Sequence, residues 1–518
     1  MLAIVKSTVL HGLDGQIVEV EVDVSRGLPC FDIVGLPDTS VRESKDRVRS
    51  AIKNSGFEFP VKRITVNLAP ADLKKEGPIY DLPVAVGILA ATGQLPLERC
   101  GLFVYLGELS LNGSLKPVTG VLPNVLTARE HSLKEVVVPL ENAKEAALVE
   151  GINVYAAGSL AQLAEFLSGK LEIYPYRLDI NELLESPGAP AFDFSDIKGQ
   201  QAAKRALEVA AAGGHNLIML GSPGSGKTLL ARSLPGILPD MTFQESIEVT
   251  KIHSLAGLLP GNRPLVTKRP FRSPHHTASP VSIIGGGRIP KPGEVSLAHN
   301  GVLFLDEMPE FHKETLEALR QPLEDGIVTI SRINASLTYP ARLMLVGAMN
   351  PCPCGYYGDP VRECTCTPHQ VQRYIARLSG PLLDRIDLHV EVPRVPYEDL
   401  SDQTRGESSA EVKKRVEYAR EIQRQRFQAD INRDSPKGFG KPHCNASMEP
   451  REVREFCKPS KKARTLLKEA FGRLGLSARS HDRILKVART IADLAGSELI
   501  EDAHIAEALQ YRSLERKL

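Results

Sequence analysis

The 518-residue sequence predicts a multidomain α/β protein, and three observations support that prediction. A short apolar run, Leu217–Leu220, precedes a glycine-rich loop and a helical segment, which is the order found at phosphate sites of parallel α/β sheets. A second apolar run, Val302–Leu305, ends in two carboxylates, as expected of another strand in that sheet. On either side of this core, residues 1–170 mix strand-like and helical segments, and residues 396–518 are mostly helical.

The order of segments also predicts the domain boundaries. Residues 1–170 form a domain with strand-like runs at 16–24, 63–68 and 135–138 and helical runs at 40–54 and 82–92. Residues 171–190 lack periodicity and end in Pro and Gly, so we expect a linker there. A nucleotide-binding core at 191–395, with an insertion at 252–300, precedes the helical region 396–518, which begins with a charged helix at 410–427.

Composition excludes several classes of protein. With 42% hydrophobic and 25% charged residues, the chain has the make-up of a globular protein. It contains no apolar run near the roughly 20 residues needed to span a bilayer, and its N-terminal apolar stretch is too short for a secretory signal. We therefore expect a cytoplasmic protein that does not enter membranes. A net charge of +1 restricts any nucleic-acid contact to local patches, and eight cysteines in so long a chain do not indicate a disulfide framework.

The glycine-rich loop is a phosphate-binding loop. Its glycines let consecutive backbone amides point at one anion, Lys227 can reach the β- and γ-phosphates, and the Thr228 hydroxyl can ligate Mg²⁺. The helix that follows adds the positive end of its dipole. We expect ATP to lie against the whole loop: Gly221, Ser222, Pro223, Gly224, Ser225, Gly226, Lys227 and Thr228.

Four further residues complete an expected ATPase site. Asp306 can hold the Mg²⁺ shell and Glu307 can orient and deprotonate the attacking water, although solvated acids after a core strand are the plain alternative. Asn350 follows a third apolar run and can polarise the water, or it can simply serve a turn. Arg385 lies in a short segment from which it can reach a neighbouring subunit's γ-phosphate, or form a surface ion pair with a flanking aspartate.

These residues, in this order, resemble the AAA+ ATPases: Walker A at 221–228, Walker B at Asp306 and Glu307, sensor 1 at Asn350 and an arginine finger at Arg385. The resemblance implies a sensor 2 arginine that reaches the γ-phosphate in cis, with Arg479 as the better match and Arg483 as the second. It also places Ile197 and Gly199 against the adenine. A finger completes a site only across an interface, so the resemblance implies a homo-oligomeric ring, expected to be a hexamer.

The insertion before Asp306 is rich in cations. Residues 261–293 contain six Lys and Arg residues and no acid, with three consecutive glycines, which favours contact with a phosphate backbone such as single-stranded or branched DNA. A solvated basic loop is the alternative. The cations are Arg263, Lys268, Arg269, Arg272, Arg288 and Lys291.

The stretch FRSPHHTASPVSIIGGGRIPKPGEVSLAHNGVLFLDE resembles the sequence shared by the magnesium chelatase ATPase subunit and the ComM/YifB proteins, a branch with helix 2 and presensor 1 insertions. Residues 324–339 would then be the presensor hairpin, which projects into the pore.

The first domain resembles the Lon protease catalytic domain, through EGPIYDLPVAVGILAATG and GELSLNGSLKPVTGV. The positions of Lon's serine and lysine fall at about Ile79 and Leu122, and an aliphatic side chain can neither attack a carbonyl nor accept a proton. Ser110, Ser114 and Lys116 belong to a different strand and turn. We therefore predict a Lon-like α+β domain without its catalytic dyad, followed by an AAA+ parallel-sheet domain and a C-terminal helical lid; this arrangement is that of the ComM/YifB proteins.

Four cysteines follow Asn350 with the spacing C-x-C-x9-C-x-C: Cys352, Cys354, Cys364 and Cys366. A hairpin could bring the four thiols around one structural Zn²⁺, and His369 could replace one ligand. Reduced thiols and a redox pair are the alternatives.

The resemblance implies an Mg²⁺-dependent ATPase that drives DNA branch migration, with helicase activity, when incoming single strands recombine in natural transformation. Residue chemistry alone supports a Mg²⁺-dependent ATPase with an insertion that faces a polyanion. The rivals are a magnesium-chelatase motor that remodels a partner protein and an ATP-dependent protease.

Overall fold

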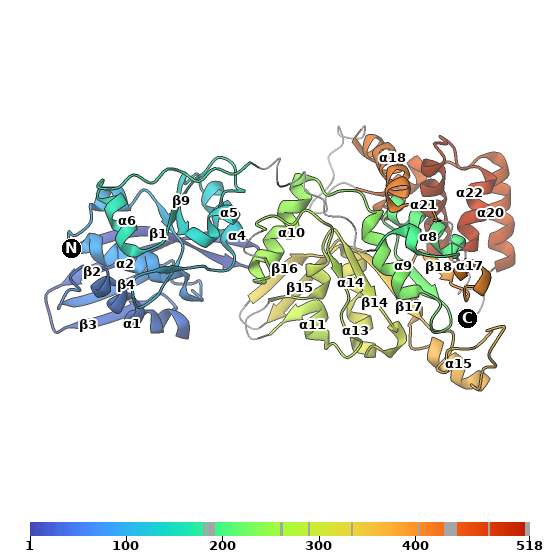
Figure 1. Ribbon diagram of the computed structural model, residues 1–518, viewed down its shortest axis with the longest axis horizontal. Coiled ribbons are helices and arrows are strands. Elements are labelled where there is room, and N and C mark those ends of the chain that lie inside the picture. The colour runs from blue at the N-terminus through green and yellow to red at the C-terminus, as the bar shows by residue number, and fades with distance from the viewer. Residues whose placement is uncertain are drawn as a thin grey trace. The chain divides into compact units, whose positions relative to one another are not determined.

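The computed structural model describes residues 1–179, 183, 192–259, 263–287, 291–332, 335–401, 405–428, 443–474 and 477–512. The chain divides into two compact units, which Figure 1 shows as ribbons. The predicted mixed α/β class is confirmed: each unit is built around its own sheet with helices packed on it. No helix of the described residues is long and apolar enough to cross a membrane.

The first unit comprises Met1–Pro187 together with two segments from later in the chain, Phe243–Thr267 and Ser331–Thr338. Its seven-stranded sheet has the order β3-β4-β2-β1-β5-β8-β9. The strands are β1 (Leu2–His11), β2 (Asp14–Ser25), β3 (Cys30–Val34), β4 (Arg63–Ala69), β5 (Val104–Tyr105), β8 (Glu135–Pro139) and β9 (Asn153–Ala157). β1 and β2 form an antiparallel hairpin, whereas β5, β8 and β9 are parallel.

Helices α2 (Asp81–Ala91), α4 (Val121–Glu130) and α6 (Leu160–Leu167) pack on this sheet, and α1 (Thr39–Asn54) packs on α2. Every residue of α2 is buried, in keeping with its almost wholly apolar sequence. Gly87 lets the helix approach the sheet, because a Cβ there would lie 2.6 Å from a methyl carbon of Val22. The one acid of α2, Asp81, receives two hydrogen bonds from Arg47, at 2.7 and 3.0 Å.

The positions that would carry a serine-lysine dyad are part of an apolar core. Leu122 on α4 is fully buried, and Ile79 packs against the same cluster of side chains. The cluster also takes up Ile247 and Leu265 from the segment Phe243–Thr267, whose helix α10 (Phe243–Leu255) packs on α4. Ser254 of α10 donates a hydrogen bond to the buried carboxylate of Glu145. Part of the insertion in the ATPase sequence therefore belongs to the first unit, because the side chains of Ile247 and Leu265 are buried there.

The second unit holds a five-stranded sheet of order β11-β14-β17-β10-β18, in which all neighbouring pairs are parallel. The strands are β10 (Leu217–Leu220), β11 (Phe271–Arg272), β14 (Val302–Leu305), β17 (Met344–Met349) and β18 (Leu388–Glu391). Every residue of β10, β14 and β17 is buried, which accounts for their uninterrupted apolar sequences. α8 (Gln201–Gly213) leads into β10, and α9 (Lys227–Ser233) follows the loop after it.

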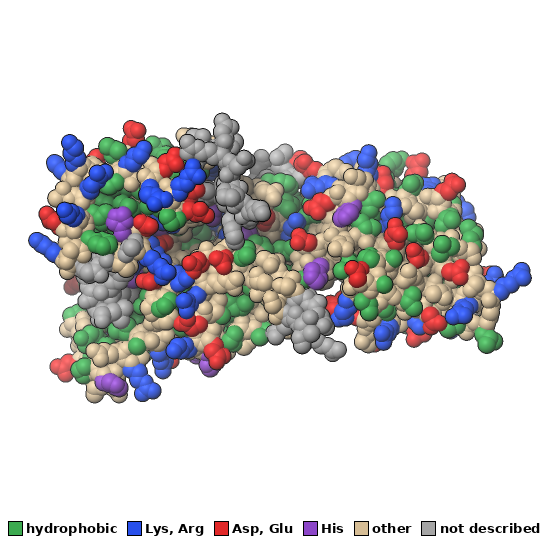
Figure 2. Space-filling model, turned by 180° about the vertical axis from the view of Figure 1, so that it is seen from behind, with side chains coloured by type: hydrophobic (Ala, Val, Ile, Leu, Met, Phe, Trp, Pro, Cys, Tyr) green, Lys and Arg blue, Asp and Glu red, His purple; other side chains and the backbone are tan. Residues whose placement is uncertain are grey.

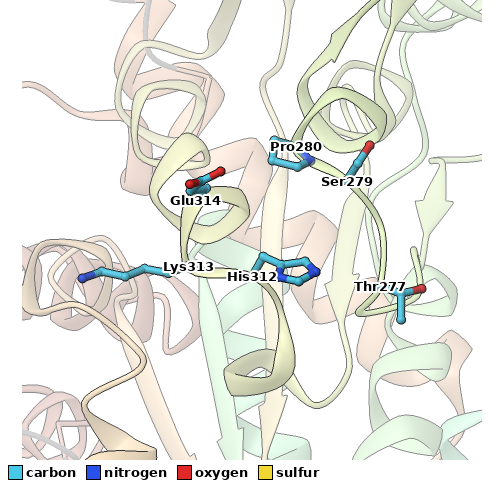
Figure 3. Close-up of a pocket in the computed structure, with 6 residues that line it drawn as sticks. All are labelled: Thr277, Ser279, Pro280, His312, Lys313 and Glu314. Carbon is cyan, nitrogen blue, oxygen red and sulfur yellow. The ribbon is translucent and has the colours of Figure 1, made fainter.

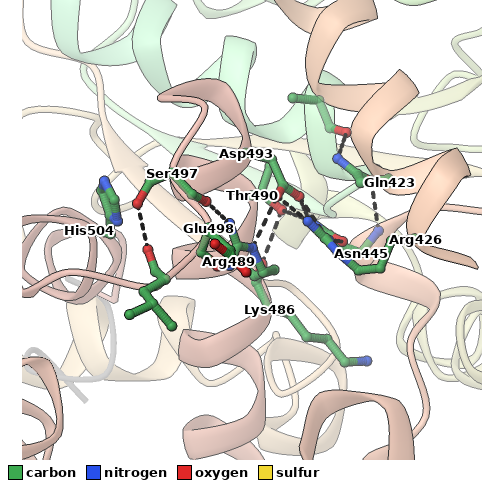
Figure 4. Close-up of polar contacts among 12 residues, drawn as sticks. Gln423, Arg426, Asn445, Lys486, Arg489, Thr490, Asp493, Ser497, Glu498 and His504 are labelled. Atoms are coloured by element: carbon green, nitrogen blue, oxygen red, sulfur yellow. Dashed lines mark hydrogen bonds and ion pairs between the residues drawn. The ribbon is translucent and has the colours of Figure 1, made fainter. Parts of the chain in front are cut away.

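The C-terminal helices pack together beside this sheet (Figure 1). They are α18 (Ser409–Gln428), α19 (Pro450–Phe456), α20 (Lys461–Leu474), α21 (Ala478–Leu494) and α22 (Asp502–Gln510). A buried polar network joins them: the Asp493 carboxylate accepts hydrogen bonds from Arg426, Arg489 and Asn445 (Figure 4). Asp493 is fully buried and Arg489 is 2% exposed, so these charges depend on one another.

The hairpin expected over residues 324–339 corresponds to β15 (Ile327–Arg332) and β16 (Ala335–Pro340), which pair in a two-stranded sheet and extend one residue beyond the expected range. Residues 333–334 lie outside the described part of the chain. Ser331–Thr338 belongs to the first unit, and the side chain of Leu337 lies against Gly12. The two ends of the hairpin remain with the second unit.

Candidate ATPase site

The phosphate loop has the backbone that its glycines predict. Gly224 and Gly226 adopt φ of +79° and +92°, a region that L side chains rarely occupy. At Gly221 a Cβ would lie 2.3 Å from the carbonyl oxygen of Val392. The loop ends at Lys227, the first residue of α9, so the free amides of the first turn of that helix face the place expected for phosphate.

Lys227 is the centre of the polar contacts at this site. Its Nζ donates to the carbonyl oxygens of Gly221 and Ser222, at 2.7 and 3.0 Å, and to Oδ1 of Asn350, at 3.2 Å. Burial lowers the pKa of Lys227, and the charges of Asp306 and Glu307 partly oppose that effect. All acceptors of the ammonium group are neutral, so a phosphate oxygen could replace them at a gain in electrostatic energy.

The two Walker B carboxylates have different surroundings. Oδ2 of Asp306 accepts a hydrogen bond of 2.8 Å from the Thr228 hydroxyl, so the two expected Mg²⁺ ligands lie within hydrogen-bond distance of each other. Two oxygen ligands at this spacing suit Mg²⁺, which keeps several waters in its shell. Glu307 is 56% exposed, in the left-handed backbone region at φ 50°. Its Oε2 lies 3.6 Å from Nδ1 of His276.

The order of the strands explains why these residues meet. β17 lies between β14 and β10, and parallel strands bring their carboxyl ends to one edge. Asp306, Asn350 and Gly221 each follow one of these three strands. The structure therefore brings together the predicted Walker A, Walker B and sensor 1 residues.

The residues expected on the adenine side lie just before α8. Ile197 is 5% exposed, whereas Gly199 is half-buried at φ +59°, where an added Cβ would lie 3.0 Å from Oδ2 of Asp399. Gln200, which the motifs did not single out, donates from Nε2 to the carbonyl oxygens of Ser225 and Pro393, at 3.2 and 2.5 Å. It thus ties this segment to the phosphate loop.

The expected arginines gather at the opposite end of the strands. Arg385 precedes β18; it donates to the carbonyl oxygen of Pro381 and forms an ion pair with Glu324. Nη1 of Arg479 lies 3.9 Å from Asp384, and Nε of Arg483 lies 3.7 Å from Asp387. We call Arg385, Arg479 and Arg483 the arginine cluster.

This placement differs from the expectation that Arg479 reads the γ-phosphate of its own subunit. β10 and β18 are parallel and in register, Leu217 beside Leu388, so Asp387 lies at the amino end of β10 and the phosphate loop at its carboxyl end. A four-residue strand spans roughly 13 Å. Arg483, 18% exposed, is held by Asp387 at the end where Arg385 lies, and Arg479, 71% exposed, lies at the same end.

The cations of the insertion do not all face solvent. Arg272 makes a bidentate ion pair with Glu294, at 2.6 and 2.7 Å, and Arg269 donates to the carbonyl oxygens of Pro239 and Asn300. Counting charges over residues 261–293 missed both contacts, since Glu294 lies outside that range and the partners of Arg269 are uncharged backbone carbonyls. Arg263, Lys268 and Lys291 are exposed, and Arg288 lies outside the described residues. Over the face shown in Figure 2, cationic and acidic side chains are intermixed.

A pocket of about 410 Å³ opens in the same region. Thr277, Ser279 and Pro280 line one side and His312, Lys313 and Glu314 the other (Figure 3). His312 points toward Thr277, whereas Lys313 extends away. Thr277, which lines the pocket, is next in sequence to His276, whose Nδ1 lies 3.6 Å from Oε2 of the Walker B acid Glu307.

The four cysteines converge, with all four sulfurs within 4.8 Å of one another. Sγ of Cys352 lies 3.3 Å from that of Cys354 and 3.6 Å from that of Cys364, too far for a disulfide. Four sulfurs placed tetrahedrally about 2.3 Å from Zn²⁺ would be roughly 3.8 Å apart. The donor set therefore fits zinc. A hydrogen bond from the Tyr356 amide contributes most to lowering the pKa of Cys354 to about 5, whereas desolvation and the neighbouring cysteines outweigh backbone hydrogen bonds and raise the pKa values of Cys364 and Cys366.

The loop that carries these cysteines rests on the phosphate loop. A Cβ on Gly355 would lie 2.6 Å from the ring of Pro223. The amides of Val361 and Arg362, together with the Ser222 hydroxyl, lower the pKa of Asp359 through hydrogen bonds. The cysteine loop therefore contacts two residues of the nucleotide site.

Comparisons with known proteins agree with this geometry. Residues 193–400 match the family model for magnesium chelatase, subunit ChlI; residues 406–512 match its C-terminal model; residues 20–142 match the model for subunit ChlI of Mg-chelatase. The chain is 48% identical to competence protein ComM of Haemophilus influenzae, over all of this chain and 98% of that protein. It is 46% identical to protein YifB of Escherichia coli, again over the whole chain and 98% of the relative.

The chain belongs to the ComM/YifB family. Membership confirms the resemblance inferred from the motifs and places the second unit among magnesium-chelatase-like AAA+ ATPases. The magnesium-chelatase 38 kDa subunit of Rhodobacter capsulatus is 26% identical over 61% of this ComM/YifB chain and 85% of its own length. Lon protease 2 of Bacillus subtilis is 25% identical over 35% of the chain and 36% of its own length.

Proposed function

We propose that this ComM/YifB protein is a Mg²⁺-dependent ATPase that works as a homo-oligomeric ring, expected to be a hexamer. The observation that carries the proposal is the convergence of Lys227, Thr228, Asp306 and Asn350 at one edge of a parallel sheet. ATP and Mg²⁺ would supply the phosphoryl group and the charge that neutralises it. The protein's residues would hold the phosphates, orient the water through Asn350 and take its proton at Glu307.

The position of the arginine cluster supports a ring. These arginines lie about one strand length from the phosphate loop of their own subunit, which favours a role at the site of a neighbouring subunit. We therefore propose that Arg479 and Arg483 act on the same nucleotide as Arg385, across the interface, where positive charge stabilises the transferring phosphate.

We further propose that ATP hydrolysis drives DNA branch migration, with helicase activity, during natural transformation. The name of the Haemophilus influenzae relative, a competence protein, supports this assignment. The exposed cations Arg263, Lys268 and Lys291 are the side chains we assign to phosphate contacts. A strand-displacement and branch-migration assay on defined forked substrates tests the activity, and absence of any DNA-stimulated ATP turnover at low salt would contradict it.

Changing Arg263, Lys268 and Lys291 together to Ala should weaken binding of single-stranded DNA uniformly across sequences. The slope of log affinity against log salt should fall in magnitude by roughly 2, since each lost phosphate contact removes about 0.7. Fluorescence anisotropy over a salt series measures both quantities. Lys461, Lys462 and Lys468, three exposed lysines on α20, provide a matched control whose removal should change the slope little. Equal effects of the two triple variants would mean that DNA contacts lie elsewhere.

The zinc site gives a separate prediction. We propose that Cys352, Cys354, Cys364 and Cys366 hold one structural Zn²⁺. Purified protein should contain one equivalent of zinc by elemental analysis, and Cys364→Ser should lose it and melt at a lower temperature. Cys30→Ser, which changes an exposed cysteine of the first unit, should keep both values. A wild-type protein without zinc would support reduced thiols instead.

A chelatase-type motor is the second candidate, favoured by the names of the matching family models. The chelatase subunit leaves more than a third of this chain unmatched, which favours the DNA motor. A protease is disfavoured because Ile79 and Leu122 contribute aliphatic side chains to an apolar core. ATP-dependent degradation of casein would contradict that conclusion.

A further inference from the structure

His215 and Asn216 join α8 to β10, at the end of the strand opposite the phosphate loop. Asn216 uses both ends of its amide. Its Nδ2 donates to the carbonyl oxygen of Arg385, at 2.9 Å, and its Oδ1 accepts from the amide of Leu345, at 2.8 Å. Leu345 lies in β17, the strand that leads to Asn350, so one side chain connects the sensor strand with the residue assigned as the finger.

His215 makes a second pair of connections and is fully buried. Its Nδ1 lies 3.1 Å from Oδ2 of Asp387, and its Nε2 lies 2.8 Å from the hydroxyl of Thr490 on α21. Burial alone would raise the pKa of Asp387, but the hydrogen bond and charge of His215 and the charges of Arg483 and Lys486 lower it to about 2. The carboxylate is therefore ionised and His215 Nδ1 is the donor.

Beyond Thr490 the contacts continue into the lid. Asn445 donates to both Thr490, at 3.0 Å, and Asp493, at 2.8 Å (Figure 4). Asp387 also faces Arg483. The dipeptide thus binds the segment that carries Arg385 on one side and the helix that carries Arg479 and Arg483 on the other.

We propose that His215 and Asn216 are positioning residues, which fix the arginine cluster relative to β10 and so couple the state of one subunit's phosphate loop to the arginines it offers its neighbour. Strand β10 connects the two places. The phosphate loop follows its carboxyl end, and His215 and Asn216 bind the arginine-bearing segments at its amino end. The proposal rests on the role in trans proposed above for Arg385.

A mixed-subunit experiment tests the proposal. Glu307→Gln and Arg385→Ala chains are co-expressed with two different tags and purified through both. In the mixed complexes, a site contains both Glu307 and Arg385 only where an Arg385→Ala subunit provides the phosphate loop and a neighbouring Glu307→Gln subunit provides the arginine. We call such a site complete. Complete sites are counted as ADP retained with aluminium fluoride, a mimic of the transferring phosphate. The mixture should trap ADP, and neither single variant should. A mixture that traps none would overturn the role of Arg385 in trans and the proposal with it.

Asn216→Ala is then added to one partner at a time. In the Glu307→Gln chain, which donates the arginine, it should reduce trapping by tenfold or more, about the effect of a misplaced group. In the Arg385→Ala chain, which provides the phosphate loop, trapping should stay within about twofold. Thr490→Val should behave in the same way, while Thr490→Ser should restore trapping.

Thr465→Val is the matched control, because Thr465 is an exposed helical threonine whose hydroxyl bonds the carbonyl four residues back, as that of Thr490 does. Equal losses in both chains would show a purely structural role and overturn the proposal. So would full trapping with Asn216→Ala in the donor chain.

Discussion

Glu307→Gln is expected to abolish ATP turnover while ATP still binds. The amide keeps the size of the carboxylate but cannot accept the proton of the attacking water, and loss of a general base costs about 10²–10⁴-fold in rate. Lys227, Thr228 and Asp306, which we assign to the phosphates and Mg²⁺, are unchanged. Phosphate release measures turnover, and a fluorescent ATP analogue measures affinity, which should stay within about threefold.

Glu310→Gln is the matched control. Glu310 is an exposed acid three residues along, and its Oε2 lies 2.7 Å from Arg377. Its substitution should leave turnover close to the unchanged protein. Undiminished hydrolysis by Glu307→Gln would show that another residue activates the water, and His276, 3.6 Å from Glu307, would be the first to change.

Asp493→Ala should destabilise the C-terminal helices by about 3–5 kcal/mol, the usual effect of removing one partner from a buried charge network. The carboxylate accepts hydrogen bonds from Arg426, Arg489 and Asn445. Its removal would leave the guanidinium group of Arg489, 2% exposed, without its counter-charge. Hydrogen exchange of the α21 amides, followed by mass spectrometry, reports the opening free energy of these helices.

Asp482→Ala changes another aspartate of α21, but this one is 43% exposed and pairs only with its neighbour His481 among the contacts of its carboxylate described in the structure. Its effect should be below about 1 kcal/mol. If the two substitutions altered exchange equally, the network around Asp493 would contribute nothing beyond helix propensity.

The nucleotide edge could be predicted from the sequence because Asp306 and Asn350 directly follow strands, and Lys227 ends the glycine-rich loop that follows a third strand. Lys227, Asp306 and Asn350 lie in short motifs, and parallel pairing brings the ends of their strands together. His276 and Gln200 could not be found this way, since each reaches its partner through a contact between segments far apart in sequence. No periodicity or spacing encodes such a contact.

The position of the sensor 2 candidates depended on tertiary structure for a similar reason. A motif places Arg479 on a helix, but the helix can pack at either end of the sheet. Here Arg479 lies near Asp384 and Arg483 near Asp387, both beside the finger segment. Charge counting overestimated the basic surface of the insertion, because Glu294 and backbone carbonyls outside the counted window bind Arg272 and Arg269.

Helix α10 lies within the ATPase part of the sequence but packs in the first unit, and this affects how the protein can be divided into fragments. Ile247 and Leu265 come from within the ATPase sequence but fill the core around Leu122. A fragment ending near residue 187 would expose that core to water, and a fragment beginning there would contain α10 without the α4 surface on which it packs. The two fragments obtained by dividing the chain near residue 187 should therefore aggregate when each is expressed alone, and become soluble only when both are produced together.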